Sequence, residues 1–298
     1  MRSRPPGLHG AHRRVELEAE LGRWAVASAI GRGELRTLWT GVVVEDRSWS
    51  ELRTRAAAAL LLAGLEAALC GPTAAALHGC RSIESADVHI VVRPEHILKK
   101  RPGLVVRHVG FYADDVVEID GLRVLAIDRV TSDLLCSGRP ADGLALADEV
   151  LKLSGDECEI MRKRIAEKIR ARQDPRGTVA GTQLLDLASP HSRSPAESWL
   201  RWGLYDAGFP IPEVNWKLIG VDGVLVYMLD LAWPSLRIAV EYDGYAAHVG
   251  RGEVDRARQD DLHGRDWIVV RAAKADLGNP TRFHRELRAA FARRGYTW

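Results

Sequence analysis

The stretch "MLDLAWPSLRIAVEYDGYAAH" (residues 228–248) places three acids, Asp230, Glu241 and Asp243, inside two apolar runs that are typical of β-strands. Carboxylates are costly to remove from water unless another group compensates their charge. Side chains alternate between the two faces of a strand, so each acid has a defined face. The stretch therefore predicts a sheet that carries a cluster of acids.

A hairpin precedes this stretch. In "KLIGVDGVLVYMLDLAW" (217–233), Asp222–Gly223 stands between two alternating runs, which is a strong signal for a tight β-turn. A second reversal at "WPSL" (233–236) returns the chain, so we expect three antiparallel strands in a meander.

The register of the second reversal decides where the acids point. If "WPSL" is a four-residue loop, Ala232 faces Arg237 and Asp230 faces Ala239, and the three acids share one side of the sheet. Asp230 and Glu241 are then diagonal neighbours, whose oxygens can reach one Mg²⁺ or Mn²⁺ ion.

Two kinds of compensation for the acids remain open. A divalent cation between Asp230 and Glu241 would relieve the repulsion that otherwise raises the pKa values of neighbouring acids. An arginine in a structural ion-pair network would do the same, and the candidates are Arg237, Arg258 and Arg271.

Sequences on both sides extend this sheet into a domain. "SPAESWLRWGLYDAGF" (194–209) predicts a helix with Ser194 as N-cap, Pro195 in the first position and Glu197 closing a capping box. His248 follows the last strand closely. "EVDRARQDDLHGRDWIVVRAA" (253–273) then predicts a helix, a turn and a buried strand, joined by a right-handed crossover to a parallel neighbour.

The front of the chain predicts a small separate module. "RRVELEAELGRWAVASAIGRGELRTLWTGVVVE" (13–45) indicates a helix, a turn at Gly22, a second helix ending at Gly31 and a strand pair around Gly41. This is a helix–turn–helix with a β-wing, an arrangement that binds DNA. The alternative is a helical cap with a solvated basic face. Candidate DNA contacts are Arg23, Arg32 and Arg36 here, and Arg258 and Arg271 near the C-terminus.

The middle of the chain, residues 50–172, mixes apolar helices with strands and is predicted to be α+β. Its acids Asp128, Asp133 and Asp148 are expected at helix starts or on polar faces, where caps explain them. We therefore predict residues 1–49 as a reduced winged helix, 50–172 as the α+β middle domain, 173–193 as a linker and 194–298 as the C-terminal domain. The fold class is α/β, or α+β for the chain as a whole.

Composition limits the partners. The chain is 46% hydrophobic and 28% charged, and its net charge of only +2 gives no global electrostatic argument for nucleic acid, so a basic surface must be local. Four cysteines form no CxxC pair, no leader-like apolar run follows the basic start, and no apolar run is long enough to span a membrane. We expect a cytoplasmic protein without a membrane partner.

The order of elements in residues 194–298 resembles the restriction-endonuclease-like nuclease core, and most closely an endonuclease family related to very-short-patch-repair (Vsr) enzymes. The segments "SPAESWLRWGL", "YMLDLAWPSLRIAVEYDGYAAH" and "DRARQDDLHGRDWIVVR" carry this resemblance. The front part resembles AbiEi-type antitoxins through "GELRTLWTGVVV", "GPTAAALHG" and "GLRVLAIDRVTSDLL".

The first resemblance implies a Mg²⁺-dependent DNA endonuclease or nickase. It implies Asp230 and Glu241 as metal ligands, Glu197 holding a metal-bound water, and His248 as a proton donor or acceptor. Nuclease cores of this class commonly carry a lysine where this chain has Asp243, and the repair nucleases lack it too. The alternative is a DNA-binding regulator or antitoxin-like protein with a weak or inactive nuclease-like domain. Its partners would be DNA and a toxin-like or repair protein.

Overall fold

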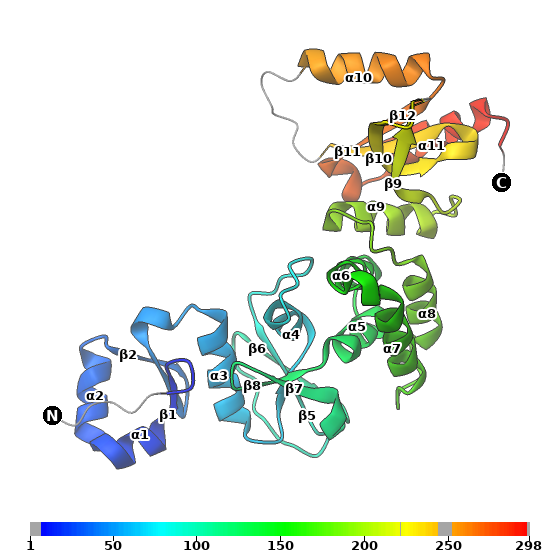
Figure 1. Cartoon of the computed structure of the whole chain (residues 1–298). Helices are drawn as coiled ribbons and strands as arrows, with labels where there is room; N and C mark the ends of the chain where they lie inside the picture. Colours follow the sequence, from blue (N-terminus) through cyan, green and yellow to red (C-terminus); the bar gives the residue numbers. More distant parts are fainter. Residues whose placement is uncertain (1–6, 221, 244–251, 297–298) are drawn as a thin grey trace. The chain divides into compact units, whose positions relative to one another are not determined.

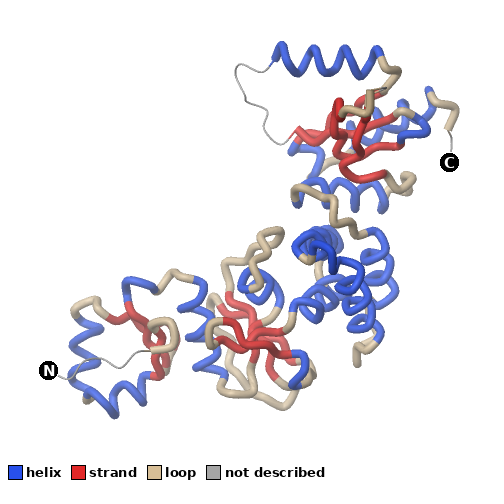
Figure 2. Tube along the Cα trace, in the orientation of Figure 1, coloured by secondary structure: helices blue, strands red, loops and turns tan. Residues whose placement is uncertain are grey.

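The computed structural model describes residues 7–220, 222–243 and 252–296 (Figure 1). The chain divides into two compact units, one of Met1–Asp133 with Arg170–Pro175 and the other of Leu134–Ile169 with Arg176–Trp298. Helices alternate with three sheets, of three, five and four strands (Figure 2). The predicted α+β fold class is therefore confirmed.

The N-terminal module is a helix pair packed on a three-stranded sheet. Its elements are β1 (Ala11–Arg13), α1 (Arg14–Leu21), α2 (Arg23–Gly31), β2 (Leu35–Trp39) and β3 (Val42–Glu45), with strand order β1-β3-β2. Gly22 (φ 88°) separates the helices and Gly41 (φ 94°) turns the hairpin, because both positions need a positive φ that glycine adopts without strain. Leu17, Val26 and Val43 pack together in its core.

The middle sheet has the order β6-β5-β4-β8-β7. Its strands are β4 (Ala68–Leu69), β5 (Val88–Val92), β6 (Leu104–His108), β7 (Val116–Ile119) and β8 (Leu122–Leu125), with helices α3 (Leu52–Ala63) and α4 (Gly71–Leu77). The alanine run of α3 is fully buried, as expected for a core helix. No helix in the described part of the chain is long and apolar enough to cross a membrane.

A helical layer follows the middle sheet. It contains α5 (Ile127–Ser137), α6 (Pro140–Leu153), α7 (Cys158–Arg170) and α8 (Thr178–Leu187). Helix α8 lies inside the segment 173–193 that we predicted as a linker, and it buries Leu184 and Leu185 in contact with this layer. The predicted domain boundaries stay predictions.

Asp148 corrects one expectation. It lies in the interior of α6 and is 2% exposed, so it neither caps a helix nor faces water. Its carboxylate pairs with Arg201, which is 1% exposed, and accepts hydrogen bonds from the hydroxyls of Ser192 (2.7 Å) and Ser198 (2.6 Å). This buried network joins α6 to α9 (Pro195–Asp206).

The C-terminal domain is a four-stranded mixed sheet with helices on both faces. Its strands are β9 (Glu213–Ile219), β10 (Leu225–Trp233), β11 (Ile238–Asp243) and β12 (Ile268–Ala273), in the order β12-β11-β10-β9, and its other helices are α10 (Gly252–Gly264) and α11 (Thr281–Arg293). Strands β9, β10 and β11 form the predicted antiparallel meander, and β12 is parallel to β11 after the α10 crossover.

Each face of this sheet has its own core. Leu200 of α9 and Phe291 of α11 pack with Leu231 and Val240 on one face. Leu262 of α10 and Trp267 pack with Leu229 on the other, so α9 and α10 lie on opposite sides (Figure 1). The two central strands, β10 and β11, which carry the acids, thus lie between helices on both faces.

Candidate functional site

The turn between β10 and β11 has the expected length but starts one residue later. Trp233 pairs with Ile238 and Leu231 with Val240, so the four-residue loop is Pro234–Arg237. Arg237 has a φ of 49°, which lets the chain reverse there. The predicted pairing of Ala232 with Arg237 is therefore wrong. The register differs from the predicted one by two residues, and because this number is even, the shift does not change which side chains of the two strands share a face of the sheet.

The strand alternation breaks at Asp230. Leu229 packs in one core and Leu231 in the other, although residues two apart in a regular strand share a face. The ladder to β11 stops at Leu231, and the Tyr242 backbone N–H donates to Asp230 Oδ2 at 2.9 Å. Asp230 thus lies across from Glu241 and Tyr242, and its carboxylate replaces a backbone acceptor of the sheet.

Glu197 occupies the first turn of α9, where Ser194 is confirmed as the N-cap. The Glu197 N–H donates to Ser194 Oγ at 3.3 Å, and the Ser194 hydroxyl donates to Glu197 Oε1 at 2.9 Å. The Arg193 N–H also donates to Glu197 Oε2 at 2.9 Å. Glu197 is only 6% exposed, so these donors stabilise a buried carboxylate.

Asn215 is a site residue that the sequence analysis missed. Its Nδ2 donates to Glu197 Oε2 at 2.8 Å, and its own position in β9 lies opposite Asp230 in the register. Its φ is 49°, a left-handed conformation that asparagine tolerates better than most residues. The sequence signal that could have indicated Asn215 was a polar residue placed directly between the apolar Val214 and Trp216 in "EVNWKLI". The Asn215 Oδ1 is buried and accepts no hydrogen bond.

Burial raises the pKa of Asp230, and the nearby negative charge of Glu197 raises it further. The Tyr242 N–H, Arg258 and Arg193 act in the opposite direction without cancelling the shift. The structure therefore brings Glu197 and Asp230 together as an interacting pair of acids.

Glu241 and Asp243 belong to a neighbouring hollow of about 160 Å³, lined by Glu241, Tyr242, Asp243, Arg258 and Arg271. Arg258 forms an ion pair with Glu241, donates to the Met228 carbonyl at 3.1 Å and lies 5.2 Å from the centre of the Tyr227 ring. Of the two compensations considered from the sequence, an arginine is therefore present for Glu241. His248 lies outside the described residues.

The donor types suit Mg²⁺, but the arrangement does not. Mg²⁺ prefers carboxylate and carbonyl oxygens in near-octahedral geometry. Within the described ranges, no group of three or more His, Cys, Asp or Glu side chains is placed to hold a metal ion. One Asp230 oxygen accepts from the Tyr242 amide, and Glu241 pairs with Arg258. The residues as arranged thus do not form a magnesium site.

The predicted DNA-contacting arginines divide between the two units. Arg32 pairs with Glu34 at 2.6 Å, Arg36 pairs with Asp46 at 2.8 Å, and Arg23 is 3.8 Å from Glu18 with its side chain 91% exposed. Arg258 and Arg271 line the hollow beside Glu241. Of the three N-terminal arginines, Arg23 is the most accessible.

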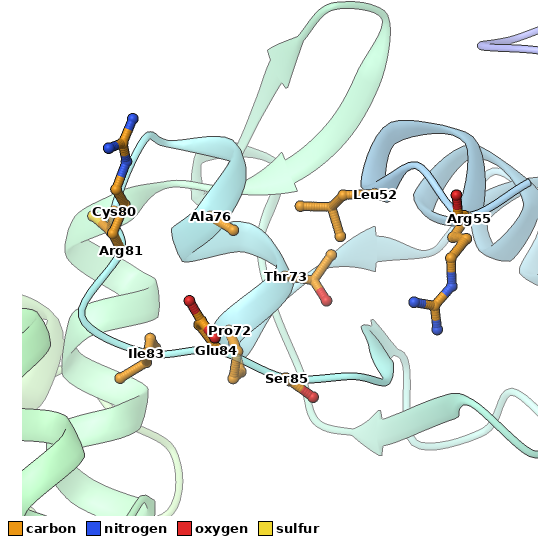
Figure 3. A pocket seen from close by; sticks show the side chains of 11 residues that line it. Leu52, Arg55, Pro72, Thr73, Ala76, Cys80, Arg81, Ile83, Glu84 and Ser85 are labelled. Atoms are coloured by element: carbon orange, nitrogen blue, oxygen red, sulfur yellow. The ribbon is translucent and has the colours of Figure 1, made fainter. Parts of the chain in front are cut away.

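A larger hollow of about 450 Å³ lies in the first unit, between α3, α4 and residues 80–85. Figure 3 shows Leu52 and Arg55 on one side and Pro72, Thr73 and Ala76 on another. Two of its polar groups have protein partners: Arg55 donates to the Ala86 carbonyl at 2.6 Å, and Thr73 Oγ1 accepts from the His89 N–H at 2.9 Å. Glu84 is the one acid of its lining, so this hollow holds no catalytic acid pair.

The raised pKa of Asp230 predicts a pH-dependent effect on stability. Because the folded state holds this proton more tightly than the unfolded state does, the contribution of Asp230 to stability falls as pH rises between the two pKa values. We expect Asp230→Asn to stabilise the protein at neutral pH by on the order of 1 kcal/mol and to have little effect at acid pH.

Denaturant unfolding of both proteins in EDTA across this pH range measures the effect. Asp206→Asn, at an exposed acid near the end of α9, is the matched control. A wild type that is more stable than the Asn variant at neutral pH would show that Asp230 is favoured in its charged form.

Comparison with known proteins finds a family similarity for the middle of the chain. Residues 67–187 match the AbiEi antitoxin C-terminal domain family, from the residue before β4 to the last residue of α8. The uncharacterized proteins MT2308 and Rv2248 of Mycobacterium tuberculosis (strains CDC 1551 / Oshkosh and ATCC 25618 / H37Rv) are each 28% identical over 244 residues, covering 81% of this chain and 86% of the relative. The predicted likeness of the front part to AbiEi antitoxins is thus confirmed for residues 67–187, and helix α8 is included in it.

Proposed function

We propose that the protein is a DNA-binding regulator of the AbiEi antitoxin type. The observation that carries this proposal is the match of residues 67–187 to the antitoxin C-terminal domain, which follows a helix–turn–helix with a β-hairpin and helix α3. In helix–turn–helix modules the second helix enters the major groove, and here that helix is α2. DNA as the partner implies a cytoplasmic protein.

In this proposal the C-terminal domain, whose order of elements resembles a nuclease core, binds instead of cutting. Arg258 neutralises Glu241, and Asp243 stands where a lysine is common in nuclease cores. A carboxylate cannot supply the positive charge that such a lysine offers to a scissile phosphate. The domain then serves as a surface for a partner, and a toxin-like protein is the partner that the antitoxin match favours over a repair protein.

A labelled duplex from the DNA immediately upstream of the protein's own coding sequence tests this function. We expect the full chain to bind it about 10³-fold or more tightly than a random duplex of equal length, as specific DNA-binding proteins do. Equal affinity for both duplexes, or no binding at low salt, would refute the regulatory function.

The second candidate is a Mg²⁺-dependent endonuclease or nickase related to the Vsr family. The order α9-β9-β10-β11-α10-β12 and the closeness of Glu197 to Asp230 favour it. A magnesium ion at Asp230 and Glu241 requires Arg258 to leave Glu241. Nicking of supercoiled plasmid in Mg²⁺ or Mn²⁺, lost in Asp230→Ala, would establish this activity; identical behaviour of both proteins would exclude it.

A further inference from the structure

Helix α2 exposes a tryptophan on the side turned away from its core. Val26 and Ala29 of α2 pack into the module, whereas Trp24 is 83% exposed. Helix α3 contacts β1 and β3, so it packs on the sheet of the module. An isolated exposed apolar residue is ordinary, but a tryptophan of this exposure on the second helix of a helix–turn–helix is placed for contact with a partner.

Within the described residues of the module, arginines and acids balance; Arg2 and Arg4 lie outside the described residues. Residues 7–49 contain six arginines and six acidic residues. Each of these arginines lies within 4 Å of a carboxylate: Arg13 and Glu16, Arg14 and Glu18, Arg23 and Glu18, Arg32 and Glu34, Arg36 and Asp46, Arg47 and Glu45. Non-specific DNA affinity comes from unneutralised cations on phosphates, so the described residues of this module offer little of it.

The surface around Trp24 suits a base edge better than a phosphate. Ala27 is exposed one turn further along α2, and Gly31 ends the helix, so small side chains let the helix approach a groove closely. Arg23, beside Trp24, has the longest of the six ion pairs and a side chain that is 91% exposed. In the major groove the thymine methyl is the apolar group that a hydrophobic side chain contacts.

We infer that Trp24 is a base-contacting residue of α2 that recognises thymine methyl groups in the major groove. This inference rests on the proposed DNA-binding function. In this inference the preference for a DNA sequence comes from the apolar contact of Trp24 with the base. Arg23 is the main residue of the module that contacts a phosphate.

Replacement of thymine by deoxyuridine in the upstream duplex tests this role, because it removes only the methyl groups. Binding is measured by fluorescence anisotropy at fixed salt. We expect wild type to bind the uridine duplex roughly tenfold more weakly than the thymine duplex, consistent with the cost of a mismatched site. Trp24→Ala should bind the thymine duplex roughly tenfold more weakly than wild type and should not distinguish the two duplexes.

Leu65→Ala is the matched control, because Leu65 is 84% exposed and lies outside the module. It should discriminate between the duplexes as wild type does. A Trp24→Ala protein that still loses affinity on methyl removal, or that binds like wild type, overturns the inference while leaving DNA binding intact. A changed molar mass in light scattering with unchanged DNA binding would instead assign Trp24 to a protein interface. Failure of wild type to prefer the upstream duplex refutes the proposed function itself.

Discussion

Asp148→Asn is expected to lower the free energy of unfolding by about 3–5 kcal/mol, because it leaves the buried Arg201 guanidinium without its counter-charge. Both side chains are almost inaccessible to water, at 2% and 1% exposure. Asparagine keeps the size of the side chain but only one of its two acceptor oxygens, and Asp148 uses both: Oδ2 accepts from the hydroxyls of Ser192 and Ser198, and Oδ1 accepts from the Ser189 N–H. The loss therefore reports the charge together with one acceptor. Chemical denaturation followed by circular dichroism measures it.

Two further variants separate this effect from general sensitivity. Asp206→Asn, at an exposed site on α9, should change stability by less than about 0.5 kcal/mol. Adding Arg201→Met to Asp148→Asn should recover part of the loss, because no buried charge then remains. If Asp148→Asn alone costs no more than Asp206→Asn, the ion pair does not join α6 to α9 as described.

Phe291→Ala is expected to cost about 3–5 kcal/mol, because it opens a cavity in the core beneath the C-terminal sheet. Phe291 is fully buried, and its ring lies 4.9 Å from Trp233 in an edge-on arrangement and 6.1 Å from Phe209. This core holds α11 against the strands that carry Asp230 and Glu241. Thermal or chemical denaturation provides the measurement.

Ile211→Ala is the control for Phe291→Ala, since Ile211 belongs to the same domain and is 62% exposed. It should change stability by less than about 0.5 kcal/mol. A loss below 1 kcal/mol for Phe291→Ala would contradict the packing of α11 on this sheet.

Local chemistry made much of the C-terminal fold predictable. The Asp222–Gly223 turn depends on a few adjacent residues, and β9 and β10 pair antiparallel around it. The same holds for Ser194 and Glu197 at the start of α9. The alternation of apolar residues then specified the meander, and the parallel β12 followed from the handedness of crossover connections.

Contacts between side chains far apart in the sequence could not be predicted from the sequence. Asp148 and Arg201 are 53 residues apart, and neither stands out from its neighbours in a helical pattern. Arg258 was one of three arginines that could pair with the acids, and only the packing of α10 on the sheet selects it for Glu241. Asn215 was missed because its role depends on an irregular backbone opposite Asp230.

The most direct measurement of the central claim combines binding and cleavage in one gel. A labelled upstream duplex is incubated with the full chain in Mg²⁺, in excess random DNA, with wild type and Asp230→Ala in parallel. A DNA-binding regulator predicts a retarded, intact duplex of equal yield for both proteins. A shortened duplex with wild type but not with Asp230→Ala, or no retarded band with either, would contradict it.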